Sequence, residues 1–266
     1  MFYVLFIGQT VLVALSMGTI ALLTGGRRTQ LSWGIARYWC WSNLKLMRFL
    51  TGIHTEVLGA ENIPPGGCIL ASKHQSDWDV FAIFPHTGRP AYIVKNELMR
   101  IPFFGSAASS MDCIAVDRSK GAEAIPLMLR KVREKLALGC RIVIFPEGTR
   151  KQPLAPAQYR AGITRMYREL NVPVVPVALN SGLFWGRNSL ILWPGIARAR
   201  ILPAIPPGLD PAQFQARLVS AIETESDALI LRAARDGLTR PIPPDLRKGL
   251  DALAERAELG TTASAD

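Results

Sequence analysis

The chain has 266 residues, of which 49% are hydrophobic and 20% are charged. This length suffices for one sizeable domain with its own core plus an appendage, and the composition excludes a wholly disordered protein. A net charge of +10 indicates an anionic partner. Nucleic acid and an anionic membrane or phosphorylated lipid are both compatible with that charge, and the hydrophobic N-terminal region favours the membrane.

Cysteine and histidine usage gives no sign of a metal site. The four cysteines are scattered without a C-x-x-C pair, and the three histidines lie far apart in the sequence. This pattern predicts neither a zinc site nor a disulfide framework, so we expect small buried thiols in a reducing compartment. We expect no metal and no cofactor.

Residues 1–24 carry no charge at all. As a helix they would be about 36 Å long, against about 30 Å for the hydrocarbon core of a bilayer. A signal peptide is the alternative, but no Lys or Arg precedes the segment and no A-x-A site follows it. Arg27 and Arg28 come next and indicate that this end faces the cytoplasm. We therefore expect a membrane helix, with the rest of the chain on the cytoplasmic face of the cell inner membrane.

Residues 31–53 are typical of a second, amphipathic helix. Arg37, Lys45 and Arg48 fall within about 80° of one another on a helical wheel, beside tryptophan and leucine. Such a helix suits the headgroup region of a membrane, but packing on the domain is an open alternative, and both can hold. The expected organisation is residues 1–53 as membrane-associated helices, 54–240 as the main domain and 241–266 as a polar tail. We expect residues 260–266 to be disordered.

From residue 54 onward, short apolar runs alternate with helical periods. Several runs are continuously apolar, as expected of strands that are covered on both faces. The alternation predicts an α/β fold with a largely parallel sheet flanked by helices. The expected strands are residues 55–59, 68–73, 91–95, 113–116, 141–145, 174–179, 189–193 and 199–202. The expected helices are residues 78–84, 122–138, 158–169 and 211–235.

His74 follows an expected strand and has Asp79 five residues later. On one regular helix these side chains would diverge by about 140°, so they can meet only if His74 precedes the helix. Ser76 or Asp77 is a suitable N-cap for a helix that starts near Trp78. An imidazole oriented by a carboxylate is suited to act as a general base near neutral pH. A histidine bound to a nearby backbone group is the structural alternative.

A second candidate block, F-P-E-G-T-R at 145–150, also follows an expected strand. Its glycine permits close backbone approach, its threonine offers a hydroxyl, and Arg150 can bind phosphate or carboxylate. Lys95 ends the expected strand at 91–95, and Arg118 follows the expected strand at 113–116. Since sites in open α/β sheets lie outside the carboxyl ends of the strands, we expect all of these residues to share one edge.

Two common nucleophile and nucleotide motifs are missing from the sequence. It contains neither a G-x-S-x-G nucleophile elbow nor a G-x-x-x-x-G-K-[ST] loop. A serine hydrolase and a nucleotide-driven kinase are therefore disfavoured.

The blocks at 74–79 and 145–150 together resemble those of glycerolipid acyltransferases of the lysophosphatidic acid acyltransferase type. The block D-C-I-A-V-D-R at 112–118 and the run V-P-V-V-P-V at 172–177 are similar to two further blocks in the same order. In the first of these, Asp112 stands where the family usually has Gly, and Ala115 where it usually has Phe. The resemblance covers about residues 50–205.

The resemblance implies transfer of an acyl group from acyl-CoA or acyl-ACP to the sn-2 hydroxyl of lysophosphatidic acid, giving phosphatidic acid. His74 would be the general base, and Asp79 would hold its imidazole. Backbone N–H groups of residues 75–77 are expected to meet the oxyanion. The expected substrate-binding residues are Lys95, Arg118, Glu147, Gly148, Thr149 and Arg150. The expected partners are the lysolipid, the thioester carrier and membrane lipids, without nucleic acid.

Three other functions stay open. An enzyme of the same family could act on another lysolipid, such as a lyso-ornithine lipid, which has no phosphate. A non-catalytic membrane scaffold would be expected to lose His74 or Asp79, and both are present. A basic nucleic-acid-binding module does not account for the uncharged N-terminal segment.

Overall fold

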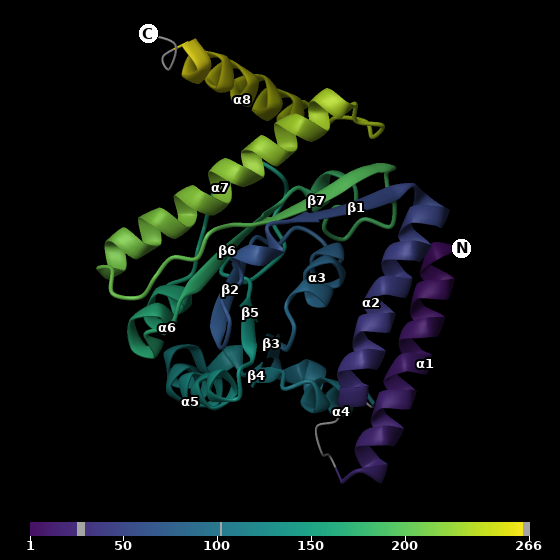
Figure 1. Cartoon of the computed structure of the whole chain (residues 1–266). Helices are drawn as coiled ribbons and strands as arrows, with labels where there is room; N and C mark the ends of the chain where they lie inside the picture. Colours follow the sequence, from purple (N-terminus) through teal and green to yellow (C-terminus); the bar gives the residue numbers. More distant parts are fainter. Residues whose placement is uncertain (26–29, 102, 263–266) are drawn as a thin grey trace.

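The computed structural model describes residues 1–25, 30–101 and 103–262 of the chain (Figure 1). Its centre is a seven-stranded sheet with the order β1-β7-β6-β2-β5-β3-β4. All neighbouring strands are parallel except β6 and β7, which are antiparallel. The expected largely parallel α/β sheet is thereby confirmed. The strands are β1 (Ile53–Leu58), β2 (Cys68–Ser72), β3 (Pro90–Lys95), β4 (Ile114–Val116), β5 (Arg141–Ile144), β6 (Val174–Leu179) and β7 (Gly195–Ile201).

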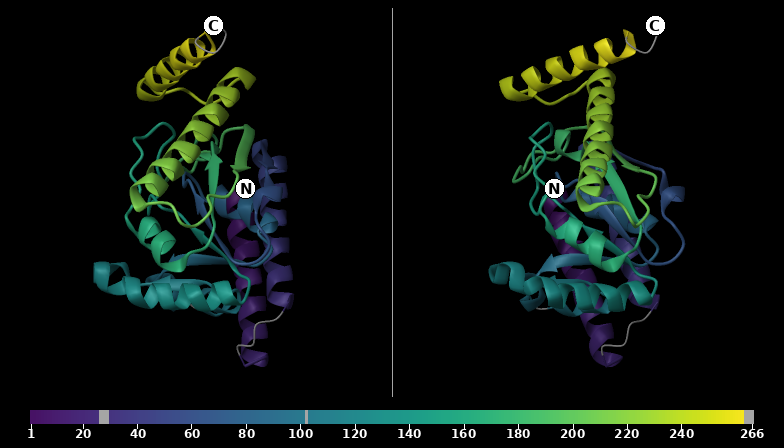
Figure 2. Two further views of the ribbon diagram at one scale, coloured as in Figure 1. Left: turned by 60° about the vertical axis from the view of Figure 1, so that its left-hand side comes forward. Right: turned by 90° about the vertical axis from the view of Figure 1, so that its left-hand side faces the viewer.

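Helices cover both faces of this sheet (Figures 1 and 2). One face packs on α5 (Ala124–Ala137), α6 (Gly162–Leu170) and α7 (Pro211–Asp236), and the other packs on α2 (Gln30–Thr51) and α3 (Trp78–Ile83). Strand β2 shows why its sequence is uniformly apolar. Ile69 lies in the core beneath α5–α7, while Leu70 lies in the core beneath α2, because successive side chains of a strand point to opposite faces.

The N-terminal helix α1 (Phe2–Leu23) lies against α2 (Figure 1). The two helices share partly buried polar contacts: the side chains of Gln9 and Asn43 are hydrogen bonded, and Trp39 Nε1 donates to Thr10 Oγ1 at 3.0 Å. By length and composition α1 could cross a membrane, and only 17% of its most apolar window is buried. The expected charges at its end, Arg27 and Arg28, lie outside the described residues.

Both ends of α1 also contact the α/β domain. At its start, the rings of Phe2 and Trp185 have centroids 5.9 Å apart in an edge-to-face arrangement. Near its end, Gly18 lies so close to Phe103 that an added Cβ would be 2.9 Å from Phe103 Cδ1. Only the outer face of α1 is therefore left exposed by the domain.

Helix α2 packs on the domain, as one of the two interpretations of its sequence predicted. Its apolar face, with Trp33 and Cys40, is buried against the domain, so domain packing is real. On its outer surface, Trp41 is exposed, with the ammonium of Lys45 5.6 Å from the centroid of its ring. Lysine and tryptophan on an exposed surface are compatible with the headgroup region of a membrane, and that interpretation stays a prediction.

Three expectations about elements change. The strand expected at 189–193 is wrong: this segment is a loop, because the Ser189 hydroxyl pairs with the backbone of Ile191 and prevents extended pairing. A short helix, α4 (Phe104–Ser110), was not expected, since its glycine and serines are weak helix formers. The polar tail contains helix α8 (Pro244–Thr262), whose Leu250 and Leu253 are buried. The expected disorder is wrong for residues 260–262, which belong to this helix, and residues 263–266 lie outside the described chain.

Candidate active site

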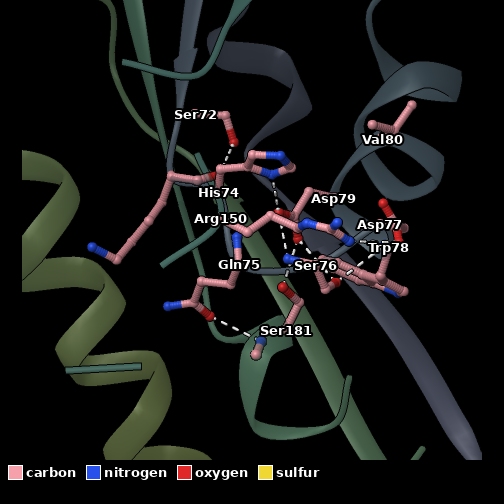
Figure 3. A network of polar contacts seen from close by, with 12 residues as sticks. Ser72, His74, Gln75, Ser76, Asp77, Trp78, Asp79, Val80, Arg150 and Ser181 are labelled. Carbon is pink, nitrogen blue, oxygen red and sulfur yellow. Dashed lines mark hydrogen bonds and ion pairs between the residues drawn. The ribbon is translucent and has the colours of Figure 1, made fainter. Parts of the chain in front are cut away.

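The loop between β2 and α3 brings His74 and Asp79 together (Figure 3). His74 Nδ1 lies 2.8 Å from Asp79 Oδ2, so the imidazole and carboxylate form a direct pair. The His74 side chain is 18% exposed and that of Asp79 is fully buried. A proton on Nδ1 would leave Nε2 of this accessible imidazole free to accept another. His74 is not part of the helix, as the five-residue spacing required.

The Asp79 carboxylate is held by donors on both of its oxygens. Oδ2 accepts from the backbone N–H groups of Gln75 at 2.7 Å and Ser76 at 3.0 Å, and Oδ1 accepts from the Ser181 hydroxyl at 2.5 Å. Such donors fix the carboxylate that in turn orients the imidazole. The expectation that the N–H groups of residues 75 and 76 meet an oxyanion is therefore wrong, since both already donate to Asp79.

Of the two residues expected to cap α3, Ser76 and Asp77, it is Ser76 that fixes the start of the helix. Its hydroxyl accepts from the backbone N–H of Trp78 at 3.1 Å, whereas Asp77 makes no side-chain cap. The Trp78 indole donates to Thr55 of β1 at 2.9 Å, which ties the helix to the far part of the sheet. The geometry of the His74 loop is therefore set locally and then anchored by packing.

Glu147 connects the second sequence block to the first. One carboxylate oxygen accepts from the backbone N–H of His74 at 2.9 Å, and the other lies 3.4 Å from Lys73 Nζ. Lys73 is buried and also pairs with Glu223 of α7 at 2.7 Å, while the Tyr159 hydroxyl donates to Glu223 at 2.8 Å. Burial raises the pKa of Glu147, and the Lys73 ammonium partly offsets this rise. Glu147 thus organises the loop through His74 and Lys73.

Further contacts hold the imidazole between the two blocks. The His74 ring stacks on Phe145, with ring centroids 4.0 Å apart and an interplanar angle of 20°. The His74 carbonyl accepts from the backbone N–H of Lys151 at 2.8 Å. Because β2 and β5 are neighbours in the sheet, the loops that follow them meet at one edge.

Gly148 adopts a left-handed conformation with φ of 72°. A Cβ at this position would lie 2.4 Å from Nε of Arg160, so glycine is required by the approach of this guanidinium. A cavity of about 510 Å³ beside the loop is lined in part by Glu147, Thr149 and Arg160. The cavity thus places Thr149 beside Arg160, a residue that no sequence motif marks, and the substrate-binding role of Gly148 and Thr149 stays a prediction.

Arg150 turns toward the first block. Its Nη1 atom lies 2.7 Å from Oδ2 of Asp77, and both side chains remain partly exposed. This ion pair joins the two loops (Figure 3). Because both of its side chains are partly exposed, we call this place the mouth of the site. A guanidinium has five donors, so this pair leaves Arg150 able to bind a further anion.

Lys95 and Arg118 lie farther along the same edge of the sheet. Lys95 ends β3 with an exposed side chain, and in the described parts of the chain no hydrogen bond or ion pair links it to the His74 loop. Arg118 begins the 3-10 helix Arg118–Glu123 after β4, and its side chain lies outside the described structure. Strands β5 and β3 separate β4 from β2, so these two residues are more distant from His74 than the 145–150 block.

The unusual Asp112 is explained by its surroundings. It adopts a φ of 64°, a left-handed conformation that suits glycine but that aspartate tolerates. Its buried carboxylate pairs with Lys135 at 2.8 Å and with Arg89 at 3.8 Å. Asp112 therefore supports the backbone conformation that glycine would supply and adds an ion pair to α5.

Comparisons with known proteins agree with this geometry. The sequence pattern of the acyltransferase family matches residues 54–180, which include both blocks of the site. Residues 54–180 are therefore similar to the acyltransferase family. It is 34% identical over 171 residues to the 1-acyl-sn-glycerol-3-phosphate acyltransferase of Pseudomonas aeruginosa, covering 64% of this chain and 66% of that protein. It is 30% identical over 180 residues to the human alpha enzyme of the same name, covering 64% of each chain. The matches thus span slightly less than two thirds of these relatives.

The fold of the chain also has a counterpart among solved structures. The crystal structure of the lysophosphatidic acid acyltransferase of Thermotoga maritima matches with a TM-score of 0.61 and 21% identity. The match covers 84% of this chain and 97% of that one. It confirms the expected glycerolipid acyltransferase-like fold.

Proposed function

We propose that this protein transfers an acyl group from an acyl thioester to the sn-2 hydroxyl of lysophosphatidic acid, giving phosphatidic acid. The observation that carries the proposal is the accessible imidazole of His74, paired at 2.8 Å with the buried carboxylate of Asp79. Its setting supports the same reaction, because the 145–150 loop, which carries Arg150, is bonded to the His74 backbone through Glu147. The named relatives from Pseudomonas and human carry the same activity in their names.

The His74–Asp79 pair suits direct attack by the acceptor. His74 Nε2 takes the proton from the sn-2 hydroxyl as the oxygen forms a bond to the thioester carbonyl carbon. Asp79 holds the proton on Nδ1 and stabilises the imidazolium that forms. The carbon–sulfur bond then breaks, and the proton passes from His74 to the departing thiolate. The substrate supplies its own nucleophile, so no covalent enzyme intermediate is needed.

The phosphate of the acceptor requires cations near the imidazole. Arg150, at the mouth of the site, is the first such group, with Gly148 and Thr149 providing close backbone approach and a hydroxyl. We assign Arg118 and Lys95, farther along the edge, to the same anion. Glu147 acts on the substrate indirectly, by fixing the His74 backbone.

Acyl-CoA or acyl-ACP is the donor in this proposal, and no cofactor takes part. Both carriers are anionic, and the net charge of +10 favours their approach. The α1–α2 pair attaches the enzyme to the membrane that holds its lipid substrate and product. We place the domain on the cytoplasmic face of the inner membrane, where arginines 27 and 28 can meet anionic headgroups.

The test compares the full-length protein in membranes with His74→Ala, using lysophosphatidic acid and either acyl thioester. His54→Ala is the matched control, because His54 is exposed on β1. Phosphatidic acid from the parent and from His54→Ala, with a loss of at least about 10³-fold in His74→Ala, is the expected result. Equal rates in all three proteins would show that His74 is structural, and no product from the parent with either donor would refute this acceptor.

A further inference from the structure

The segment that precedes β7 exposes two large aliphatic side chains at its tip. Leu190 is 80% exposed and Ile191 is 58% exposed. The segment is nevertheless ordered by its own contacts. Ser189 Oγ bonds to the backbone of Ile191, and the backbone N–H of Trp193 donates to the Phe184 carbonyl at 2.9 Å. These two adjacent side chains form a small apolar patch that a fixed turn holds in water, and its meaning depends on the apolar surface around it.

This tip lies beside the start of α1. The Tyr3 hydroxyl donates to the carbonyl of Ser189 at 3.1 Å, and the ring of Trp185 packs edge-to-face on Phe2. The outer face of α1 is itself apolar and exposed, with Val4 at 74% and Ile7 at 58%. The exposed apolar surface of the helix and that of the loop therefore border one another.

The same segment also reaches the catalytic site. Arg187 Nη1 donates to the backbone carbonyl of Arg150 at 3.4 Å. The turn at Ser181–Leu183 that leads into the segment is bonded to the catalytic loop, since the Gly182 N–H donates to Gln75 Oε1 at 2.9 Å. Fewer than ten residues thus separate the exposed tip from groups that hold the His74–Asp79 pair.

We propose that Leu190 and Ile191, together with the start of α1, insert into the interfacial region of an anionic lipid bilayer. The occupant of this surface is lipid because the neighbouring helix α1 is long and apolar enough to cross a membrane and because the loop carries an exposed cation at Arg187. Leucine and isoleucine gain free energy on leaving water for the acyl region, and arginine suits the phosphate level above it. The continuity with α1 is the reason for preferring a bilayer to a second protein.

The insertion has a consequence for the substrate, which rests on the proposed function. A lysolipid beside the inserted loop would lie next to the Asp77–Arg150 ion pair at the mouth of the site. It could then present its headgroup to His74 without its acyl chain crossing water. The loop would act on substrate delivery and not on the chemical step.

Fluorescence tests the insertion directly. Leu190→Cys in the full-length protein is labelled with a polarity-sensitive probe, and Leu127→Cys on α5, at a residue 47% exposed, is the matched control. Of the native cysteines, Cys40, Cys68 and Cys140 are buried and Cys113 is half-buried, and the labelled parent protein measures their background. On addition of phosphatidylglycerol-containing vesicles, we expect a blue shift and quenching by lipid-borne quenchers at 190 only. A probe at 190 that stays in water on vesicle-bound protein would refute the proposal. A shift that depends on protein concentration without vesicles would also refute it, in favour of a second copy.

Kinetics test the delivery step. Leu190→Ser/Ile191→Ser is compared with Leu127→Ser/Leu138→Ser, which changes two exposed leucines at α5. For long-chain lysophosphatidic acid in vesicles, we expect the loop variant to be slower by about fivefold or more, and the control to be unchanged. For a short-chain, water-soluble substrate, both variants should match the parent. An equal loss on both substrates would refute the delivery role. If the parent protein made no product at all, the proposed function would fail, while the fluorescence result would still decide the insertion.

Discussion

The hydroxyl of Ser181 donates to Oδ1 of Asp79 at 2.5 Å, although 102 positions separate the two residues in the sequence. Both side chains are fully buried. Ser181 lies in the turn directly after β6, and Asp79 lies in the first turn of α3, so this bond joins two neighbouring loops at the carboxyl edge of the sheet. The carboxylate that orients His74 is thus held from outside its own loop.

We expect Ser181→Ala to lower kcat by roughly tenfold, because a hydrogen bond to a charged group would be lost at the carboxylate that positions the base. The KM for lysophosphatidic acid should change by less than about twofold, since Ser181 is fully buried and its hydroxyl is bonded to Asp79. Steady-state kinetics of the folded protein measure both values. Ser181→Thr, which keeps the hydroxyl, should recover most of the rate. An unchanged kcat in Ser181→Ala would mean that the contact does not act on the base.

Gly148→Ala should lower kcat/KM by about tenfold or more. The substitution forces a side chain into a left-handed backbone conformation and places its Cβ 2.4 Å from Arg160 Nε, so the loop must move. Gly66→Ala is the control, because Gly66 has a φ of 88° but no atom within 4 Å of an added Cβ. Both variants should lose about 1 kcal/mol of stability, and only Gly148→Ala should lose activity. Equal activities would show that Arg160 gives way without moving the loop.

Lys73→Met should lower the free energy of unfolding by about 3–5 kcal/mol. The ammonium is buried between Glu147 and Glu223, and its removal leaves two carboxylates near one another without a cation. Denaturant unfolding measures the change. Lys248→Met is the control at an exposed position and should stay within about 0.5 kcal/mol of the parent. A similar small loss of stability in both variants would show that protonation or solvent relieves the repulsion between the Glu147 and Glu223 carboxylates.

Glu147 should contribute a distinct pH dependence of stability. Burial raises its pKa above the ordinary value of 4.5, with Lys73 and the His74 N–H opposing and Glu223 reinforcing that rise. A carboxyl with a raised folded pKa favours folding when protonated, so its contribution is present below about pH 4.5 and is lost as the pH rises through the folded pKa. In Glu147→Gln this loss should disappear, and melting temperature should fall less steeply from pH 4.5 upward than in the parent. Parallel melting curves would contradict the assignment.

Much of the fold could be read from the sequence because it depends on short stretches of chain. The continuous apolar run of β2 predicted a strand covered on both faces, and both faces are covered. The spacing of His74 and Asp79 required a turn before the helix, and Ser76 provides it. Backbone conformation over a few residues decides such features, and the residue types record it directly.

The partners of the site residues depended on the strand order, which no local pattern contains. Ser181 and Glu223 reach the His74 loop only because β6 lies beside β2 and α7 packs on β6. Sequence reasoning had one usable signal for Ser181, its position after a strand, and none for Glu223.

The sequence by itself determined the two blocks, the strands that carry them and the family they resemble. Only the tertiary structure decided that the N–H groups of residues 75 and 76 serve Asp79, that Arg150 pairs with Asp77, and that Leu190 stands exposed beside α1. Hydrogen bonds and ion pairs act over about 3 Å, so they depend on which distant segments the fold brings within that range.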